Sequence, residues 1–396
     1  MERINKFAKV IRNNWKKSTV AAVALSTKYG DMMIPMDRNP TLVTVILNPV
    51  ANKRKAKQDY EKYCEPLLHL AGLQVDVIQT TSEGNAKDVV ETLRGTEAII
   101  VAGGDGTLAE SITGLLRRSD NANQFPLGIL PLGRTNTIGN TLFPGGSGVE
   151  KVRQLIEASM AIIKGNTIWK DAIKVEPIAD EETTSKPIYA MSSLEWGAFR
   201  DTFARKDKYW FYGFLRGYAA FIFNGYKNNL TWDCSGTIRY TKPCDGCGNC
   251  LEKKPEVKRK WLFFIPKTEA VQPEKAVNPE CAEVHELCFK TSEFEIFSPN
   301  VKKVGDQSAL NIKLGKPSYT YVEFVNEGWN RLKGVHEDNK FIAARTIELL
   351  PRPAEDPEKA ETIEIDKEEF DAKPVKITLL PKVVKLFCRP GQEYMT

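Results

Sequence analysis

The chain has 396 residues, of which 42% are hydrophobic and 27% charged, as in a soluble globular protein with room for two domains. Its formal net charge is +5, and the excess lies at the start: residues 1–28 hold seven basic residues and one acid. The remainder is close to neutral. No global basic field therefore indicates a nucleic-acid partner, and we expect none.

The N-terminal segment, residues 1–40, has the pattern of a basic amphipathic helix. Ile4, Phe7, Ile11 and Trp15 recur at helical spacing between basic side chains. The longest apolar run, residues 20–25, is too short for a bilayer span, which needs about 20 residues. The pattern predicts mitochondrial targeting or attachment to a membrane surface, and a solvated tail is the alternative.

Residues 41–165 alternate between strand and helix patterns. Alternation of this kind predicts right-handed crossovers and a mostly parallel sheet, with ligands bound at the carboxyl ends of the strands. Asn48, Thr80, Gly103 and Gly133 all fall at such ends, which predicts one cleft. The predicted strands are 41–49, 73–81, 97–104 and 125–133, and the predicted helices are 53–72, 85–95, 107–118 and 149–165.

Residues 166–396 read as a β-rich second domain with one aromatic, helix-like piece at 208–226. Residues 251–286 are rich in Lys, Glu and Pro and predict an extended loop. Residues 354–371 contain nine acids and two lysines, which is typical of a solvated segment. The predicted strands lie at 188–197, 321–326, 346–353, 363–370 and 374–382.

Four cysteines lie close together in the sequence and form a candidate zinc site: Cys234, Cys244, Cys247 and Cys250. Two-residue spacers between thiols are typical of zinc ligands, but the usual second pair is missing. Cys281 and Cys288 are other candidates for a fourth ligand. A glycine-rich surface loop with free or disulfide-bonded thiols is the alternative to zinc.

The run GGDGT at residues 103–107 ends an apolar strand and opens a helix. Glycine amides followed by a helix N-terminus form a site for anionic oxygens. The Asp105 carboxylate would repel a phosphate there unless it bound Mg²⁺ or accepted a proton from a nucleophile, and both roles belong to phosphoryl transfer. The glycine spacing matches neither the P-loop nor the dinucleotide fingerprint, and a plain turn remains the alternative.

Four segments together resemble the lipid kinase family that includes the diacylglycerol, sphingosine and ceramide kinases. They are NPVANKRKA, GGDGTLAE, PLGRTNTIGNTL and IEIDKEEFDAKPVKITLLP. Their order and spacing look most like the mitochondrial acylglycerol kinases of that family. The resemblance implies an α/β fold: a parallel-sheet nucleotide-binding domain at 41–165, then a β-rich β-sandwich domain for the lipid at 166–396, with the active site between them.

The resemblance also implies roles for individual residues. Glu368 is the candidate general base, with Asp366 supporting it, and Asp105 lies at the phosphates and Mg²⁺ or bonds the acceptor hydroxyl. The residues that match the ATP-binding positions are Asn48, Thr80, Gly103, Gly104, Gly106, Thr107, Arg134 and Asn136.

The chain departs from the family pattern at four positions. Asn52 and Lys367 stand where the family has glycine, and Arg134 and Thr137 stand where it prefers Thr and Asp. The lost Asp removes one carboxylate that could organise Mg²⁺, whereas Arg134 adds a cation near the phosphates. These departures agree with two outcomes: the charge changes compensate each other, or catalysis is weakened.

The implied reaction transfers the ATP γ-phosphate to monoacylglycerol and diacylglycerol, giving lysophosphatidic and phosphatidic acid at the mitochondrial inner membrane, facing the intermembrane space. The alternative is an assembly subunit of the inner-membrane carrier translocase, with kinase activity dispensable; a sphingosine or ceramide kinase is a weaker one. Candidate acyl-pocket residues are Trp210, Phe214, Phe221 and Phe223, although single residues of such a run more often belong to a core helix.

Overall fold

The computed structural model describes residues 41–119, 125–178, 186–227, 234–243, 283–300, 308–333, 341–352 and 362–392. The described residues from Leu42 onward belong to one compact unit. The N-terminal segment 1–40 and most of the cysteine-rich insertion lie outside the described residues, so the predictions made for them are not tested by the fold. Among the described residues, no helix has the length and apolarity needed to span a membrane.

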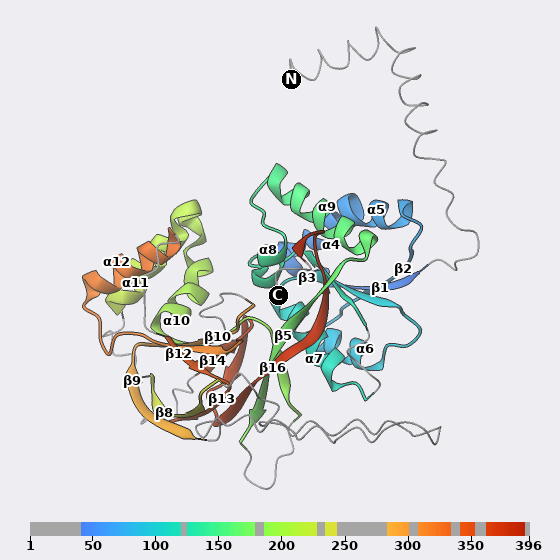
Figure 1. Cartoon of the computed structure of the whole chain (residues 1–396). Helices are drawn as coiled ribbons and strands as arrows, with labels where there is room; N and C mark the ends of the chain where they lie inside the picture. The colour runs from blue at the N-terminus through green and yellow to red at the C-terminus, as the bar shows by residue number, and fades with distance from the viewer. Residues whose placement is uncertain are drawn as a thin grey trace, which may run out of the picture. The chain divides into compact units, whose positions relative to one another are not determined.

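The N-terminal half is the predicted parallel sheet with helices on both faces (Figure 1). Its strands are β1 (Leu42–Leu47), β2 (Gln74–Gln79), β3 (Ala98–Gly103) and β4 (Leu127–Pro131), in the order β2-β1-β3-β4. All six residues of β3 are buried, as in a strand covered on both faces. The covering helices include α5 (Glu65–Leu70), α6 (Asn85–Thr92), α7 (Asp105–Arg117) and α9 (Val149–Lys164).

The predicted helix at 53–72 is interrupted. Its parts are α3 (Ala51–Arg54), α4 (Ala56–Asp59), a π-helical turn η1 (Tyr60–Cys64) and α5. Asn52 and Lys53 have φ of 49° and 57°. Asn is among the few side chains that tolerate this left-handed region, which explains how Asn52 replaces the glycine of the family pattern. The short helix α8 (Thr137–Leu142) was not predicted.

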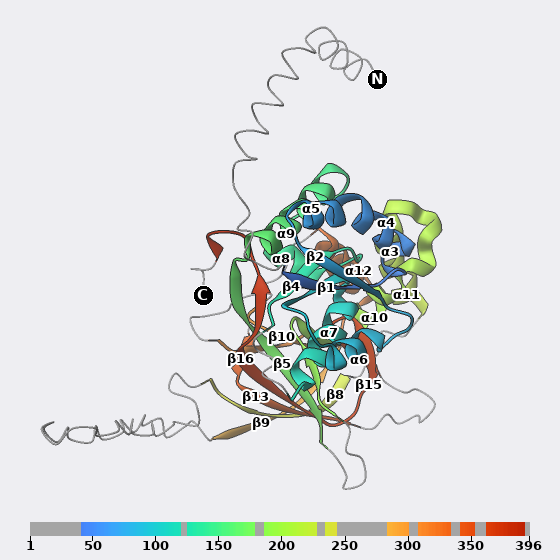
Figure 2. The ribbon, with the colours of Figure 1, turned by 90° about the vertical axis from the view of Figure 1, so that its right-hand side faces the viewer.

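The C-terminal strand joins the two halves into one ten-stranded sheet. Strand β16 (Val375–Phe387) pairs parallel with β4 at Leu386 and antiparallel with β5 (Thr167–Pro177) along most of its length. On the edge opposite β5, which β4 also occupies, it pairs with β13 (Thr346–Pro351), followed by β8 (Cys234–Thr241) and β9 (Val284–Thr291), while β6 (Ile188–Ala190) pairs with β5. Figure 2 shows β5 and β16 running together between the two halves.

A second, antiparallel sheet faces this extension and completes the predicted β-sandwich. Its order is β12 (Phe341–Ala344), β11 (Leu310–Leu314), β10 (Glu293–Phe297), β7 (Ser193–Gly197), β14 (Thr362–Ile365) and β15 (Glu368–Asp371). Side chains from both sheets form one apolar core that is separate from the core around the parallel sheet. The α/β fold with a β-rich second half is therefore confirmed.

Four helical elements pack beside the second sheet (Figure 1): α10 (Ala198–Ala204), the 3₁₀ segment η3 (Arg205–Leu215), α11 (Arg216–Lys227) and α12 (Tyr321–Leu332). The strand predicted at 321–326 is wrong, because these residues begin α12. Thr320 and Glu323 form a reciprocal capping box at its start, and buried Phe324 packs on Phe199 and Phe221. A run of six residues is too short to distinguish the two-residue period of a strand from the 3.6-residue period of a helix.

The acidic run at 354–371 is not wholly solvated. Strand β14 lies between β7 and β15, so Glu364 and Asp366 are buried. Buried carboxylates need partners, and both have them. These partners are part of the candidate site.

Candidate active site

A cavity of about 390 Å³ opens at the carboxyl ends of β1, β2 and β3 and the start of α7. This is where open α/β sheets bind ligands. The structure brings together here most of the predicted nucleotide residues and the predicted base: Asn48, Thr80, Gly104, Gly106, Thr107, Arg134 and Glu368. The predicted cleft is present, and residues that follow several strands line it together.

Two glycine contacts shape the wall of this cavity. A Cβ on Gly133 would lie 2.3 Å from the Cα of Gly104, so the loop after β4 packs backbone against backbone on the GGDGT loop. A Cβ on Gly106 would lie 3.1 Å from the Glu368 Oε1 atom. The missing side chains thus let a second loop and the Glu368 carboxylate approach the helix N-terminus closely.

Asn48 and Thr107 connect strand β1 to helix α7. Asn48 Nδ2 donates to Thr107 Oγ1 at 2.9 Å, and Asn48 Oδ1 accepts from the Val50 amide at 3.1 Å. The Thr80 amide donates to the Leu47 carbonyl at 2.9 Å, which holds the end of β2 beside β1. These bonds fix the floor of the cavity.

The Asp105 carboxylate points toward the loop after β4 and lines neither of the cavities described here. It is buried and accepts three hydrogen bonds: from Thr135 Oγ1 at 2.5 Å, from the Thr137 amide at 2.6 Å and from Thr137 Oγ1 at 3.2 Å. Thr137, which replaces the Asp of the family pattern, is thus a partner of Asp105 and not a second carboxylate. In this arrangement Asp105 positions the loop that carries Arg134.

Asn136 also acts within that loop. Its backbone is left-handed, with φ of 51°, and its buried amide exchanges two hydrogen bonds of 2.8 Å with the backbone of Gly133. Gly103 ends β3, where a Cβ would meet Thr107 Oγ1 at 2.8 Å. Neither residue lines the cavity, so both shape the loops that do.

Glu368 is the predicted general base, and its surroundings favour the protonated form. Burial, together with the nearby carboxylates of Glu110, Glu83 and Asp366, raises the pKa of Glu368 to about 8. Three acids close to one carboxyl group in a cavity are typical of a functional site, because a fold gains no stability from such repulsion.

Asp366 is buried in the hairpin turn between β14 and β15 and holds a neighbouring segment. Its carboxylate accepts from the backbone amides of Met191 at 2.6 Å, Ser192 at 2.8 Å and Ser193 at 3.0 Å, and from the Ser192 hydroxyl. These contacts leave Asp366 out of both cavities, so it supports Glu368 by fixing the turn.

Lys367 occupies the turn position where the family pattern has glycine. Asp366 and Lys367 have φ of 48° and 73°, the pair of positive values that a type I′ turn requires. The Lys367 ammonium donates to Glu195 at 2.7 Å and to Glu364 at 2.9 Å, and both carboxylates raise its pKa. The two ion pairs offset the backbone strain of a non-glycine residue here.

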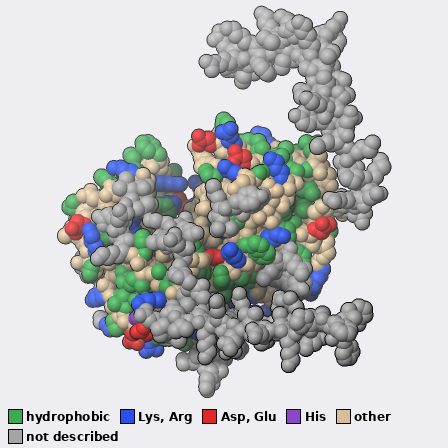
Figure 3. Space-filling view, in the orientation of Figure 1, with side chains coloured by type: hydrophobic (Ala, Val, Ile, Leu, Met, Phe, Trp, Pro, Cys, Tyr) green, Lys and Arg blue, Asp and Glu red, His purple; other side chains and the backbone are tan. Residues whose placement is uncertain are grey.

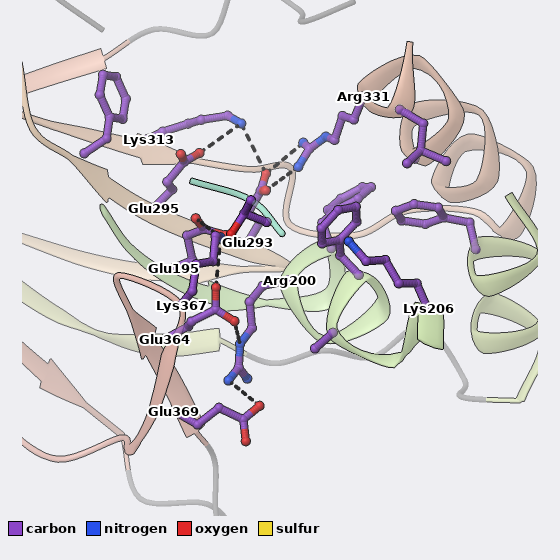
Figure 4. Close-up of a pocket in the computed structure, with 18 of the residues that line it drawn as sticks. Glu195, Arg200, Lys206, Glu293, Glu295, Lys313, Arg331, Glu364, Lys367 and Glu369 are labelled. Atoms are coloured by element: carbon purple, nitrogen blue, oxygen red, sulfur yellow. Dashed lines mark hydrogen bonds and ion pairs between the residues drawn. The ribbon is translucent and has the colours of Figure 1, made fainter. Parts of the chain in front are cut away.

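A second cavity, of about 770 Å³, lies between the second sheet and the helices beside it, with Lys367 and Arg134 among its lining residues. Figure 4 shows the two ion-pair networks that form its polar end. In one, Arg200 bonds Glu364 and Glu369, and Lys367 bonds Glu364 and Glu195. In the other, Glu293 accepts from Arg331 and Lys313, and Lys313 also bonds Glu295.

The helical side of the second cavity, here called its apolar end, carries apolar side chains, and the Arg331 guanidinium lies over the Phe199 ring there. This end is lined by Phe199, Phe203, Phe221 and Leu332. Of the four predicted acyl-pocket residues, only Phe221 lines the cavity. Trp210, Phe214 and Phe223 do not.

Of the four cysteines in the predicted zinc site, only Cys234 lies among the described residues. Cys234 is buried in the sandwich core at the start of β8, whereas Cys244, Cys247 and Cys250 follow the far end of that strand and lie outside the described residues. Within the described ranges, no three His, Cys, Asp or Glu side chains are grouped so as to hold a metal ion. Zinc finds no support here and stays a prediction.

Sequence reasoning missed several residues of both cavities. Glu110 follows Gly106 by one helical turn, a spacing that could have revealed it, and it accepts from the amides of Gly84 and Ala86 at 2.9 and 3.1 Å. No such signal exists for Arg200 and Arg331. Both lie on helices, and apart from the local pairs with Asp201 and Glu327 their carboxylate partners come from strands of the second sheet, which only the tertiary structure brings near.

Comparison with known proteins places both halves of the chain. Residues 42–175 match the diacylglycerol kinase catalytic domain, and residues 191–395 match the acylglycerol kinase C-terminal domain. A diacylglycerol kinase structure from Bacillus anthracis shares the fold, with a TM-score of 0.52 and 17% identity over 88% of this chain and 97% of that one.

Two curated relatives match nearly the whole chain. The mitochondrial acylglycerol kinase of Homo sapiens is 32% identical over 97% of this chain and 96% of that protein, and the Xenopus laevis one is 32% identical over 99% and 97%. A sphingoid long-chain base kinase from Arabidopsis thaliana is 30% identical over 44% of this chain and 24% of that protein. The catalytic-domain match and the adjoining cavities define an ATP-dependent lipid kinase. Within that class, the chain belongs to the acylglycerol kinase family.

Proposed function

We propose that this lipid kinase transfers the γ-phosphate of ATP to the free hydroxyl of monoacylglycerol and diacylglycerol, giving lysophosphatidic and phosphatidic acid. One observation carries the proposal. The smaller cavity, with the nucleotide residues, and the larger one, with a polar and an apolar end, share Arg134. The β14–β15 turn also lies between them, with Lys367 in the larger cavity and Glu368 in the smaller.

This arrangement suits a direct transfer between two bound substrates. The start of α7 and its glycines receive the ATP phosphates, because unpaired amides and the helix dipole favour anions. Glu368 accepts the proton of the acceptor hydroxyl as that oxygen attacks the γ-phosphorus and ADP leaves. Arg134, at the junction, offsets the charge on the transferring oxygens. Asp105 holds the Arg134 loop in place.

The residues around Glu368 fit a Mg²⁺ ion. Mg²⁺ is bound by one or two carboxylates together with substrate phosphates, and Glu83 and Glu110 supply carboxylates beside Glu368 at the nucleotide cavity. When bound, the ion neutralises the charge of the phosphate oxygens. A cation there also lowers the pKa of Glu368 toward the ionised form that a base needs.

The acceptor cavity supports an acylglycerol in particular. Its apolar end can cover an acyl chain, while the carboxylates of Glu195 and Glu369 and the cations beside them at the other end can bond glycerol hydroxyls. Sphingosine carries an amine, and ceramide an amide, at the central carbon where an acylglycerol carries oxygen.

A side-by-side kinase assay tests the proposal. Monoacylglycerol, diacylglycerol, ceramide and sphingosine are offered with Mg²⁺-ATP, and we expect turnover with the two acylglycerols. Turnover with sphingosine or ceramide alone would show that the acceptor is a sphingolipid and not an acylglycerol. The absence of turnover with every lipid would favour the carrier translocase assembly subunit, and Asn52, Arg134, Thr137 and Lys367 would then mark a lost active site.

We propose further that residues 1–34 bring the protein to the mitochondrial inner membrane, on the side of the intermembrane space. The basic amphipathic pattern and the mitochondrial relatives support this location. Deletion of residues 1–34 should release the protein from mitochondria in a fractionation experiment. Undiminished mitochondrial association of the deleted protein would contradict the proposal.

A further inference from the structure

One stretch of the described chain exposes aromatic side chains to an unusual degree. In η3, Trp210 is 73% exposed, Phe211 63% and Phe214 90%. We call these three side chains the aromatic ledge. Figure 3 shows hydrophobic side chains gathered at the upper left, over the helices beside the second sheet. Contiguous exposed apolar surface of this kind marks an interaction site.

The ledge is built outward from a fixed base. Tyr209 stacks on Phe223 of α11, with ring centroids 5.5 Å apart, and Tyr212 packs on the same ring at 5.8 Å. Gly213 adopts φ of 58° and breaks the segment before Phe214. Two tyrosines thus attach η3 to α11, while the ledge residues between and after them face solvent.

Basic residues flank the ledge in the sequence. Residues 205–216 contain four basic residues, Arg205, Lys206, Lys208 and Arg216, and a single acid, Asp207. That acid is already paired, because Arg134 and Arg216 both bind its carboxylate. The segment that carries the aromatic side chains therefore has a net positive charge.

The ledge continues from the apolar end of the acceptor cavity. Phe203 and Lys206 line that cavity, and the Lys206 ammonium lies 3.4 Å from the centre of the Phe203 ring. Phe203 is itself partly exposed. An acyl chain that leaves the apolar end would pass directly toward η3.

We infer that the aromatic ledge docks onto the surface of an anionic lipid bilayer. Exposed Trp and Phe with a basic surround are the composition of interfacial membrane-binding segments: the rings enter the headgroup region and the cations meet anionic lipids. An anionic bilayer satisfies both the exposed rings and the cations at once, whereas a protein partner would have to match them with an apolar surface bordered by acids. The docking is independent of turnover and of the nature of the acceptor, so it can fail or hold separately from the proposed reaction.

Vesicle sedimentation of the full chain tests this docking without nucleotide or acylglycerol. The variant Trp210→Ser with Phe214→Ser removes two ledge rings, and the control Leu70→Ser with Val149→Ser removes two equally exposed apolar side chains elsewhere. On phosphatidylcholine vesicles containing phosphatidylglycerol, we expect the ledge variant to bind about tenfold more weakly, since each lost ring removes buried apolar area. The control should bind like the wild type.

A second readout separates the ledge from the N-terminal segment, which is itself predicted to bind membranes. Brominated lipid should quench the fluorescence of Trp210, so quenching should be smaller in Trp210→Phe than in the wild type. Equal quenching in both proteins, or equal vesicle binding by the ledge variant and the wild type, would overturn the inference. So would a dimer in sedimentation velocity that the ledge substitutions convert to monomer, because the ledge would then be a contact between copies.

Discussion

Replacing Glu368 by Gln keeps the size of the side chain and removes its titration. In the folded protein, burial and neighbouring carboxylates raise the pKa of Glu368 from 4.5 to about 8. A raised folded-state pKa stabilises the fold below the unfolded pKa, and this stabilisation is lost as the pH rises toward the folded value. The wild type should therefore lose stability relative to Glu368→Gln between about pH 5 and about pH 9.

The structure bounds the size of this effect. At about 1.4 kcal/mol for each pKa unit, a shift from 4.5 to about 8 gives at most ~5 kcal/mol. Glu368 keeps part of its surface in solvent, where water and salt screen the repulsion, so we expect ~2 kcal/mol. A difference of this size moves the Tm of a chain this long by a few degrees.

Thermal unfolding across this pH range measures the effect. The Tm of Glu368→Gln should match the wild type in acid and exceed it in alkali. Glu97→Gln, a change at an exposed carboxyl group, is the control and should follow the wild type throughout. Parallel curves for Glu368→Gln and the wild type would refute the raised pKa, and with it the description of Glu368 as a buried carboxyl group poised to accept a proton. The same variant should lower kcat by about 10²–10⁴ if Glu368 is the base.

Three further changes test the loops. Asp105→Asn should lower kcat by ~10²-fold or more, and it should lower the free energy of unfolding in urea by ~1–3 kcal/mol, because the new amide group faces hydrogen-bond donors; an unchanged kcat would contradict a positioning role. Gly133→Ala should raise the KM for ATP by ~10-fold or more, since its Cβ would overlap Gly104; an unchanged KM would mean that the loops separate freely. Lys367→Met should destabilise the protein by ~2 kcal/mol at neutral pH, because two carboxylates lose their cation, and part of the loss should recover in acid as they take up protons; equal losses at both pH values would count against the ion pairs.

The sequence was sufficient for those parts of the fold that local patterns specify. The strands around GGDGT and the helices between them follow from hydrophobic period and turn residues, and parallel crossovers then bring Asn48, Thr80 and Gly104 to one edge. The pattern failed where two periods compete over a short run. Residues 321–326 have a pattern that is compatible with a strand, but they begin a helix whose first turn is stabilised by the capping box of Thr320.

The tertiary structure alone decided what the charged residues do. Asp105 looked like a free carboxylate in a phosphate loop, but it bonds Thr135, 30 residues away. Asp366 looked like an exposed hairpin acid, but it is buried and accepts hydrogen bonds from the backbone amides of residues 191–193, the first of which lies 175 residues earlier. The larger cavity combines side chains from all six strands of the second sheet, from the helices α10, α11 and α12 and from the η3 segment. Sequence period reports which face of an element is apolar, whereas the partner of a buried charge depends on which distant strand lies beside it, and no local pattern carries that information.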